Sequence, residues 1–135
     1  MITLPKELET GVAKIDSQHR ELIDRLNAVT SMGMQAVTKE ETLKTLDLLG
    51  NYIMRHFTDE EVLLMQCKYP KLEWHKEQHR LYFIEFIKLK KNFAASGHSP
   101  KYTLELTNSI INWIVRHIKT VDVDMGRHLR SAGMA

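Results

Sequence analysis

Histidines and a glutamate recur at four-residue intervals in the middle of the chain. His56 and Glu60 are four residues apart, and so are His75 and His79. Residues with this spacing lie on the same face of an α-helix, so each pair could direct two ligand atoms at one metal ion. A lone histidine on an apolar helix face is more often a hydrogen-bonded core residue, but two such pairs together favour a metal centre.

Further histidines fall on the apolar faces of other expected helices. His19 and His117 each interrupt a stripe of apolar residues, so the chain would bury five imidazoles and one carboxylate. Burying such groups without partners costs roughly a few kcal/mol each, and the total approaches the stability of a small domain. These ligands exceed the needs of one tetrahedral zinc ion, so the sequence predicts two metal ions. His98 and His128 lie outside these stripes and are expected to be solvated.

Two metal ions that share bridging carboxylates need a second acid near His117. Asp122 and Asp124 are the candidates. In a regular α-helix a residue five positions after His117 lies about 140° around the axis, whereas a residue seven positions later lies on the same face. Periodicity alone therefore favours Asp124. Asp122 reaches the His117 face only if the turn between them is widened, as in the π-bulges that occur at functional sites.

Helices are expected to position all of these residues, because no sustained alternation of period two predicts a strand. Proline, glycine and capping residues divide the chain into four helical segments. The first runs to about Gln35, a T-x-x-E capping box at Thr38–Glu41 opens the second, Pro70 and Ser96-Gly97 bound the third, and Ser99-Pro100 opens the fourth. Such short connections predict an all-α, antiparallel up-down-up-down four-helix bundle with an irregular N-terminal arm.

Apolar residues spaced three and four apart form one stripe along each expected helix, and these stripes should meet in the bundle core. We expect a single domain over residues 1–135, with an N-terminal arm at 1–17, the bundle at 18–122 and a C-terminal tail at 123–135. The expected core residues are Ile15, Leu22, Leu26, Val29, Leu46, Leu49, Ile53, Leu63, Tyr82, Phe86, Leu89, Phe93, Leu106, Ile110 and Trp113.

Composition and charge exclude several classes of protein. The 135 residues, 43% of them hydrophobic, suit one globular domain with a core. The net charge of +2 and the lack of a basic stripe interleaved with aromatic residues argue against a nucleic-acid partner. Because we find no signal sequence and no apolar run of about 20 residues, we expect a cytoplasmic protein without a membrane partner. The segment H-K-E-Q-H lacks the glutamate that follows the first histidine in zinc peptidases.

The same residues resemble a known family. His19, H-F-T-D-E at 56–60, H-K-E-Q-H at 75–79 and H-I-K-T-V-D at 117–122 occur in the order typical of hemerythrins, in particular of the single-domain bacteriohemerythrins. Trp113, four residues before His117, also resembles a family feature. The N-terminal arm has Leu4-Pro5 where many relatives carry a tryptophan. The resemblance implies a non-haem di-iron centre with an oxo or hydroxo bridge.

The resemblance also implies a role for each ligand. His75, His79 and His117 would bind one iron, and His19 and His56 the other. Glu60 and Asp122, rather than Asp124, would bridge both ions. The second iron would keep an open position for oxygen. The apolar residues expected to flank this position are Ile23, Phe57, Trp113, Ile114 and Ile118.

The function implied is reversible oxygen binding by a carrier, buffer or delivery protein that is not an enzyme. Its partner would be dioxygen, and the protein that receives the oxygen is not identified. The main alternative is a di-iron redox enzyme acting on peroxide, oxygen or nitric oxide. An oxygen or redox sensor, an iron-storage protein and a structural zinc site are further alternatives. Di-iron oxygenases generally use more carboxylates, so the histidine-rich ligand set argues against oxygenation.

Overall fold

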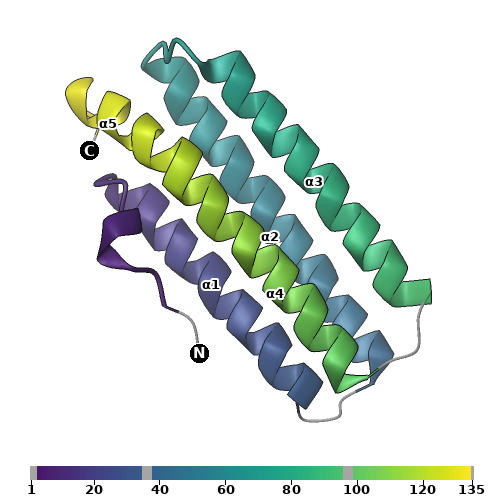
Figure 1. Cartoon of the computed structure of the whole chain (residues 1–135). Coiled ribbons are helices and arrows are strands. Elements are labelled where there is room, and N and C mark those ends of the chain that lie inside the picture. The colour runs from purple at the N-terminus through teal and green to yellow at the C-terminus, as the bar shows by residue number, and fades with distance from the viewer. Residues whose placement is uncertain (1–2, 35–37, 96–98, 135) are drawn as a thin grey trace.

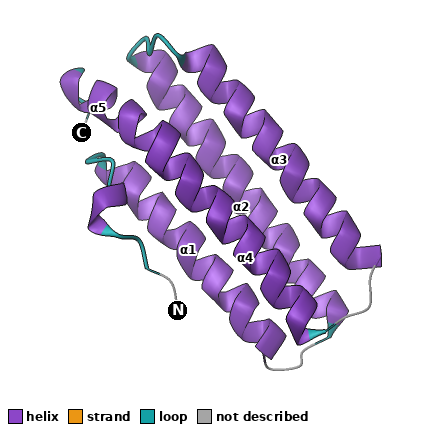
Figure 2. Ribbon diagram, viewed as in Figure 1, coloured by secondary structure: helices purple, strands orange, loops and turns teal. Residues whose placement is uncertain are grey.

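The computed structural model describes residues 3–34, 38–95 and 99–134. The four long helices are α1 (Ala13–Met34), α2 (Lys39–Gln66), α3 (Leu72–Ala95) and α4 (Pro100–His117), and they lie side by side (Figure 1). A π-helical turn, η2 (Ile118–Asp122), joins α4 to the shorter α5 (Val123–Ser131), and a 3-10 turn, η1 (Lys6–Leu8), lies in the N-terminal arm. The described residues include no strand (Figure 2). The predicted all-α four-helix bundle is confirmed.

Capping residues determine where the second and fourth helices begin. The Thr38 side chain accepts a hydrogen bond from the Glu41 backbone N–H at 3.2 Å, as the capping-box pattern predicts. Ser99 does the same for Tyr102 at 3.1 Å, and Pro100 occupies the first turn of α4. Pro70 lies in the turn that precedes α3. The ends predicted at Gln35 and Ser96-Gly97 fall outside the described residues.

The apolar stripes meet inside the bundle, where α1 packs against α2 and α4, and α2 packs against α3. Most of the predicted core residues are buried, but Leu63, Leu89 and Trp113 are only partly buried. Leu64 is fully buried in place of Leu63. This difference arises because the C-terminal residues cover the neighbouring face of α2, which the spacing within α2 cannot indicate.

The segment just before α1 and the helix α5 pack together over one end of the bundle. The predicted irregular arm is shorter than residues 1–17, because α1 begins at Ala13. The predicted C-terminal tail contains α5, whose Met125 and Leu129 are buried. Gly126 permits close packing, since a Cβ atom there would lie 2.5 Å from the Thr10 carbonyl oxygen. These segments pack with α1, α2 and the turn before α3 in a second apolar cluster of Val12, Ile15, Leu64, Tyr69, Met125 and Leu129.

The buried Asp16 carboxylate holds the arm against α1. It accepts hydrogen bonds from the backbone N–H and hydroxyl of Thr10, both at 2.7 Å, and from the Gly11 N–H at 3.1 Å. These bonds satisfy polar groups just before the first turn of α1 and direct the arm towards α5.

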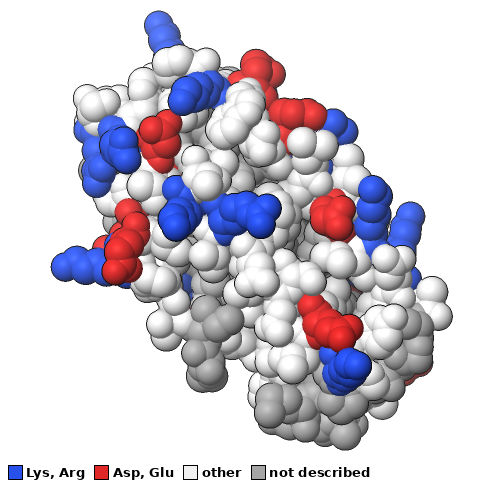
Figure 3. All heavy atoms as spheres, in the orientation of Figure 1, with Lys and Arg blue, Asp and Glu red and all other residues white. Residues whose placement is uncertain are grey.

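Charges of both signs are interspersed over the face shown in Figure 3, as expected for a net charge of +2. Within the described residues, no helix combines the length and apolar character needed to cross a membrane. The polar residues that the helices bury are more informative about function than this surface.

Candidate metal centre

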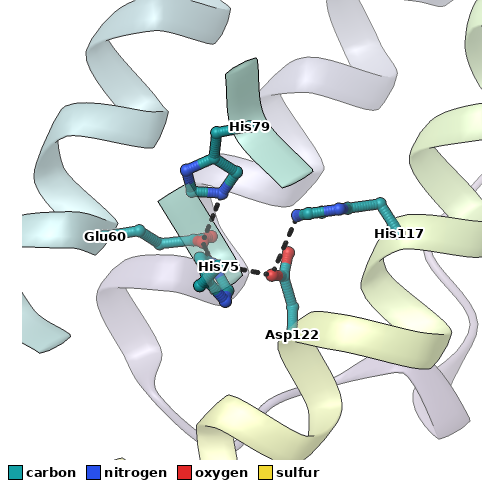
Figure 4. A group of neighbouring side chains, drawn as sticks. All are labelled: Glu60, His75, His79, His117 and Asp122. Atoms are coloured by element: carbon teal, nitrogen blue, oxygen red, sulfur yellow. Dashed lines mark hydrogen bonds and ion pairs between the residues drawn. The ribbon is translucent and has the colours of Figure 1, made fainter. Parts of the chain in front are cut away.

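Side chains from all four long helices and from η2 converge at the end of the bundle covered by α5. All seven predicted ligands are buried, and none exposes more than 6% of its surface. Figure 4 shows five of them pointing towards one another from α2, α3, α4 and η2. The seven residues are His19 from α1, His56 and Glu60 from α2, His75 and His79 from α3, His117 from α4 and Asp122 from η2.

The Glu60 carboxylate lies between two groups of histidines. Its Oε2 atom is 2.7 Å from His56 Nε2 and 3.4 Å from His19 Nε2. Its Oε1 atom is 2.9 Å from His75 Nε2 and 3.3 Å from His79 Nε2. One oxygen therefore faces the histidines of α1 and α2, and the other faces those of α3.

The two oxygens of the Asp122 carboxylate likewise face different groups of histidines. Its Oδ2 atom is 3.0 Å from His19 Nε2, whereas its Oδ1 atom is 3.2 Å from His117 Nε2 and 3.5 Å from His75 Nε2. Both carboxylates thus join a two-histidine group to a three-histidine group, and each acid has one oxygen on either side.

The ligand atoms are close enough to hold metal ions. Those of Glu60, His75, His79, His117 and Asp122 lie within 4.8 Å of one another, and the same holds for His19, His56, Glu60 and Asp122. Several of these atoms are buried without a hydrogen-bond partner among the described residues. They include Nε2 of His19, His79 and His117, Oε2 of Glu60 and both oxygens of Asp122.

Buried polar atoms that make no hydrogen bond are costly, and the nearby imidazole–carboxylate contacts offset this cost only in part, so a bound cation suits this set. Imidazole nitrogens and carboxylate oxygens suit first-row transition metals such as iron, zinc and copper. The donor atoms divide into two groups that share two acids, and they therefore fit two ions.

The π-helical turn decides which aspartate reaches the centre. In η2, hydrogen bonds between residues five apart wind more residues into each turn than in an α-helix. Asp122, five residues after His117, consequently lies beside it. Asp124 is at the surface, with its Oδ2 atom 3.4 Å from the Tyr69 hydroxyl and 3.5 Å from Lys71 Nζ. The expectation from α-helical periodicity, that Asp124 would share the His117 face, is wrong because the helix is not regular here.

Two side chains outside the predicted set orient the histidines. Gln18 Oε1 lies 2.6 Å from His56 Nδ1, and Gln18 Nε2 donates to Asp59 Oδ2 at 2.8 Å. Glu61 Oε2 lies 2.8 Å from His79 Nδ1. Each contact places a proton on Nδ1 and leaves Nε2 free to face the centre. Sequence reasoning gave neither residue a role, although Gln18 precedes His19 in a segment, Ile15–His19, that resembles the family, and Glu61 directly follows Glu60.

We predict that replacing Gln18 by Ala weakens metal binding by about tenfold to a hundredfold without removing the centre, because His56 loses the partner that sets its orientation. The affinity would be measured by competition with a chelator of known affinity. A Gln66→Ala variant is the matched control, since Gln66 is exposed at the end of α2. Equal affinities in the Gln18→Ala variant and the parent would contradict this role.

Mutual electrostatic effects shift the pKa values within the metal-free centre. Burial lowers the pKa of His19, but the Asp122 and Glu60 carboxylates outweigh this effect and raise it to about 9. Burial also lowers the pKa of His79, but the Glu60 carboxylate outweighs this effect, so the pKa is raised. Burial would raise the pKa of Glu60, yet His56 and the other histidines hold it well below its usual value. The carboxylates are therefore charged and ready to bind cations.

These shifts predict that metal affinity rises with pH. In the metal-free protein His19 stays protonated up to about pH 9, whereas an ordinary histidine loses its proton near pH 6.5. A metal ion must displace this proton. The apparent affinity should increase by about tenfold per pH unit for each proton displaced, and level off above pH 9 or so. Chelator competition at several pH values, with proton release followed by an indicator dye, measures this dependence. An affinity independent of pH between about 7 and 9 would contradict it.

A small cavity of about 10 Å³ adjoins the centre, which is near the lower limit for one water-sized molecule. Its lining includes four of the five predicted pocket residues, Phe57, Trp113, Ile114 and Ile118. Ile23 is buried in the core but is not part of this lining. Residues that sequence reasoning did not place here are Leu22, Ile53 and Tyr82.

Aromatic rings pack directly on the histidines at the edge of this cavity. Phe57 stacks on His79 with ring centroids 3.8 Å apart, and Trp113 stacks on His117 at 4.7 Å. These contacts limit the motion of the two imidazoles and cover them with apolar surface. His128 lies away from the centre, next to Tyr69 and the Cys67 carbonyl, and His98 falls outside the described residues.

Comparison with known proteins identifies one family. The Hemerythrin HHE cation binding domain matches residues 10–129. A bacteriohemerythrin of Stenotrophomonas maltophilia (strain R551-3) is 31% identical over 120 residues, which cover 86% of this chain and 73% of the relative. One from Clostridium acetobutylicum is 30% identical over 128 residues, or 90% of this chain and 96% of the relative.

The similarity extends to a solved structure. A crystal structure of wild-type hemerythrin superimposes with a TM-score of 0.82 at 27% identity, covering 96% of this chain and 97% of that chain. The matched residues 10–129 include every side chain of the buried cluster. Sequence, fold and the buried donor set thus agree.

Proposed function

Because the chain belongs to the hemerythrin family, we propose that it binds dioxygen reversibly at a non-haem di-iron centre, as an oxygen carrier, buffer or delivery protein that performs no turnover of its own. The observation that carries this proposal is the pair of buried ligand groups joined by Glu60 and Asp122. A cavity near the lower size limit for one water molecule adjoins them. The relatives named bacteriohemerythrin support the choice of iron.

In this proposal His75, His79 and His117 hold one ion, and His19 and His56 hold the other. Glu60 and Asp122 would be shared by both ions, in keeping with the division of their oxygens between the two groups. The two-histidine ion has fewer protein ligands, and both of its histidines line the cavity. When bound, two ferrous ions supply the electrons for reversible binding of dioxygen at that side.

The chain's own residues keep the centre dry and its ligands in place. Phe57, Ile114 and Ile118 are all buried, and all three line the cavity. Gln18 and Glu61 hold the histidine rings through Nδ1. A rigid apolar wall excludes bulk water from the bound ligand, which favours release of unchanged oxygen over its reduction.

We predict that replacing Trp113 by Ala speeds the irreversible oxidation of the reduced, iron-loaded protein. The partly buried indole covers His117 and lines the cavity, so its removal should admit water. The oxidation rate in air would be followed by absorption and compared with a Trp74→Ala control, in which the lost side chain is exposed. An unchanged rate in Trp113→Ala would show that this indole does not shield the centre.

Oxygen cycling tests the proposed function itself. The iron-loaded protein is reduced without air, exposed to oxygen and then flushed with argon, while the charge-transfer absorption is recorded. A band that appears with oxygen and disappears under argon over repeated cycles supports a carrier or buffer. An oxidised form that argon does not reverse, with release of peroxide or water, would instead support the redox enzyme. Steady consumption of peroxide or nitric oxide with a reductant present would support the enzyme too.

A further inference from the structure

Tyr82 in α3 lines the cavity beside the centre, and its buried hydroxyl has no hydrogen-bond partner among the described residues. The residue is 2% exposed, and it lines the same cavity as His19, His56 and His117. It is not one of the proposed metal ligands, and no role described above uses its hydroxyl.

An unpaired buried hydroxyl requires an explanation. Burial removes the water that would bond to it in the unfolded chain, and nothing in the described protein replaces that bond. A phenylalanine would fill nearly the same space without this cost. The other buried tyrosine, Tyr69, differs in this respect, because its hydroxyl donates to Asp124 at 3.4 Å.

We propose that the Tyr82 hydroxyl donates a hydrogen bond to the small ligand that occupies this cavity. Tyr82 would then be a specificity-determining residue, which favours diatomic or triatomic ligands with an acceptor atom over apolar molecules of the same size. This inference rests on the proposed function, since it assigns a selective contact within the same oxygen site.

The packing around Tyr82 holds its ring in one orientation. Trp113 stacks on the ring with an interplanar angle of 16°, and Phe57 meets it edge-on at 75° with centroids 5.9 Å apart. Side chains on a helix lean towards its N-terminus, which on α3 is the end that carries His75 and His79. The hydroxyl is therefore oriented in advance, and little conformational entropy is lost when it bonds to a ligand.

The chemistry of the lining supports a donor role for Tyr82. Outside the ligand set, Leu22, Ile53, Phe57, Ile114 and Ile118 offer no hydrogen bond, and the Tyr82 hydroxyl and the Trp113 indole N–H are the side-chain donors of the lining. Burial raises the pKa of the Tyr82 hydroxyl far above its usual value. The group stays protonated at any ordinary pH, so it can donate a hydrogen bond but is a poor source of a full proton.

A Tyr82→Phe variant tests this inference with azide, a small anion that carries acceptor atoms. Azide is titrated into the oxidised, iron-loaded protein, and the charge-transfer band and the infrared azide stretch are recorded in H₂O and D₂O. We expect about tenfold weaker binding in Tyr82→Phe, and loss of the shift between H₂O and D₂O. Tyr102→Phe is the matched control, because Tyr102 is 47% exposed in α4, and it should bind azide as the parent does.

The metal-free proteins provide a second measurement that does not depend on iron. Tyr82→Phe should unfold at the same or a higher urea concentration than the parent, because it removes an unpaired buried hydroxyl. A lower urea midpoint would mean that the hydroxyl has a protein partner and would overturn the inference. Equal azide affinity with an unchanged isotope shift would also overturn it. If the iron-loaded parent gave no azide band, the di-iron proposal itself would fail, and this inference with it.

Discussion

Replacing Glu60 by Ala is expected to lower the iron content from about two ions per chain to well below one, because this carboxylate contacts four of the five histidines. Its two oxygens lie within 3.4 Å of Nε2 of His19, His56, His75 and His79. No other acid in the described cluster occupies this central position between α2 and α3.

The same substitution should also destabilise the metal-free protein. Glu60 is fully buried and charged, and its loss leaves histidines whose raised pKa values depend on its charge, His19 and His79 among them. Breaking such a buried charge pair costs about 3 kcal/mol or more. Urea unfolding of metal-free parent and variant measures this loss, and metal analysis after reconstitution measures the iron.

Glu77→Ala is the matched control for Glu60→Ala. Glu77 lies between His75 and His79 in the sequence, but it is on the outer face of α3 and bonds to Arg80. This variant should retain about two ions per chain, since exposed ion pairs contribute little. Full iron content in Glu60→Ala would remove Glu60 from the proposed ligands.

Replacing Asp122 by Ala is the second change with a large expected effect. Asp122 is fully buried and contacts His19, His75 and His117, so its loss removes the second bridging acid. We expect no stable pair of ions, with iron content falling to about one ion per chain or less. The charge-transfer absorption that requires two ions should disappear as well.

Asp124→Ala distinguishes between the two candidate acids. Asp124 is a surface residue that bonds to Tyr69 and Lys71, so this variant should keep both ions and lose at most about 1 kcal/mol of stability. The reverse result, with iron lost in Asp124→Ala and kept in Asp122→Ala, would mean that the turn after His117 is a regular α-helix in solution.

Local sequence patterns were sufficient to predict most of the fold and many residues of the proposed centre. The i, i+4 pairs His56–Glu60 and His75–His79 share a helix face through backbone geometry alone. Capping at Thr38 and Ser99 depends on a side chain and a backbone N–H three residues later. Such features depend only on residues within a short segment of the chain. The family resemblance follows from the order of the ligands along the chain.

Other features depended on contacts between segments that are distant in sequence. Leu64 rather than Leu63 is buried because α5 and the N-terminal arm cover that face of α2. Gln18 contacts His56 across 38 residues of sequence, and the unpaired hydroxyl of Tyr82 is evident only from its surroundings in three dimensions. Helical periodicity predicts which face of a helix a residue lies on. It does not predict which residue of another segment packs against that face.

The sequence by itself determined the bundle, the starts of α2 and α4 and the four-residue ligand pairs, because these follow from backbone periodicity and local capping. Only the tertiary structure showed how Asp122, which the family resemblance implied and α-helical periodicity disfavoured, comes to lie beside His117. A π-helical turn departs from regular hydrogen bonding and lacks a signal in periodicity. In this chain, η2 carries the buried Asp122 beside His117 and leads into α5, whose apolar face closes the end of the bundle.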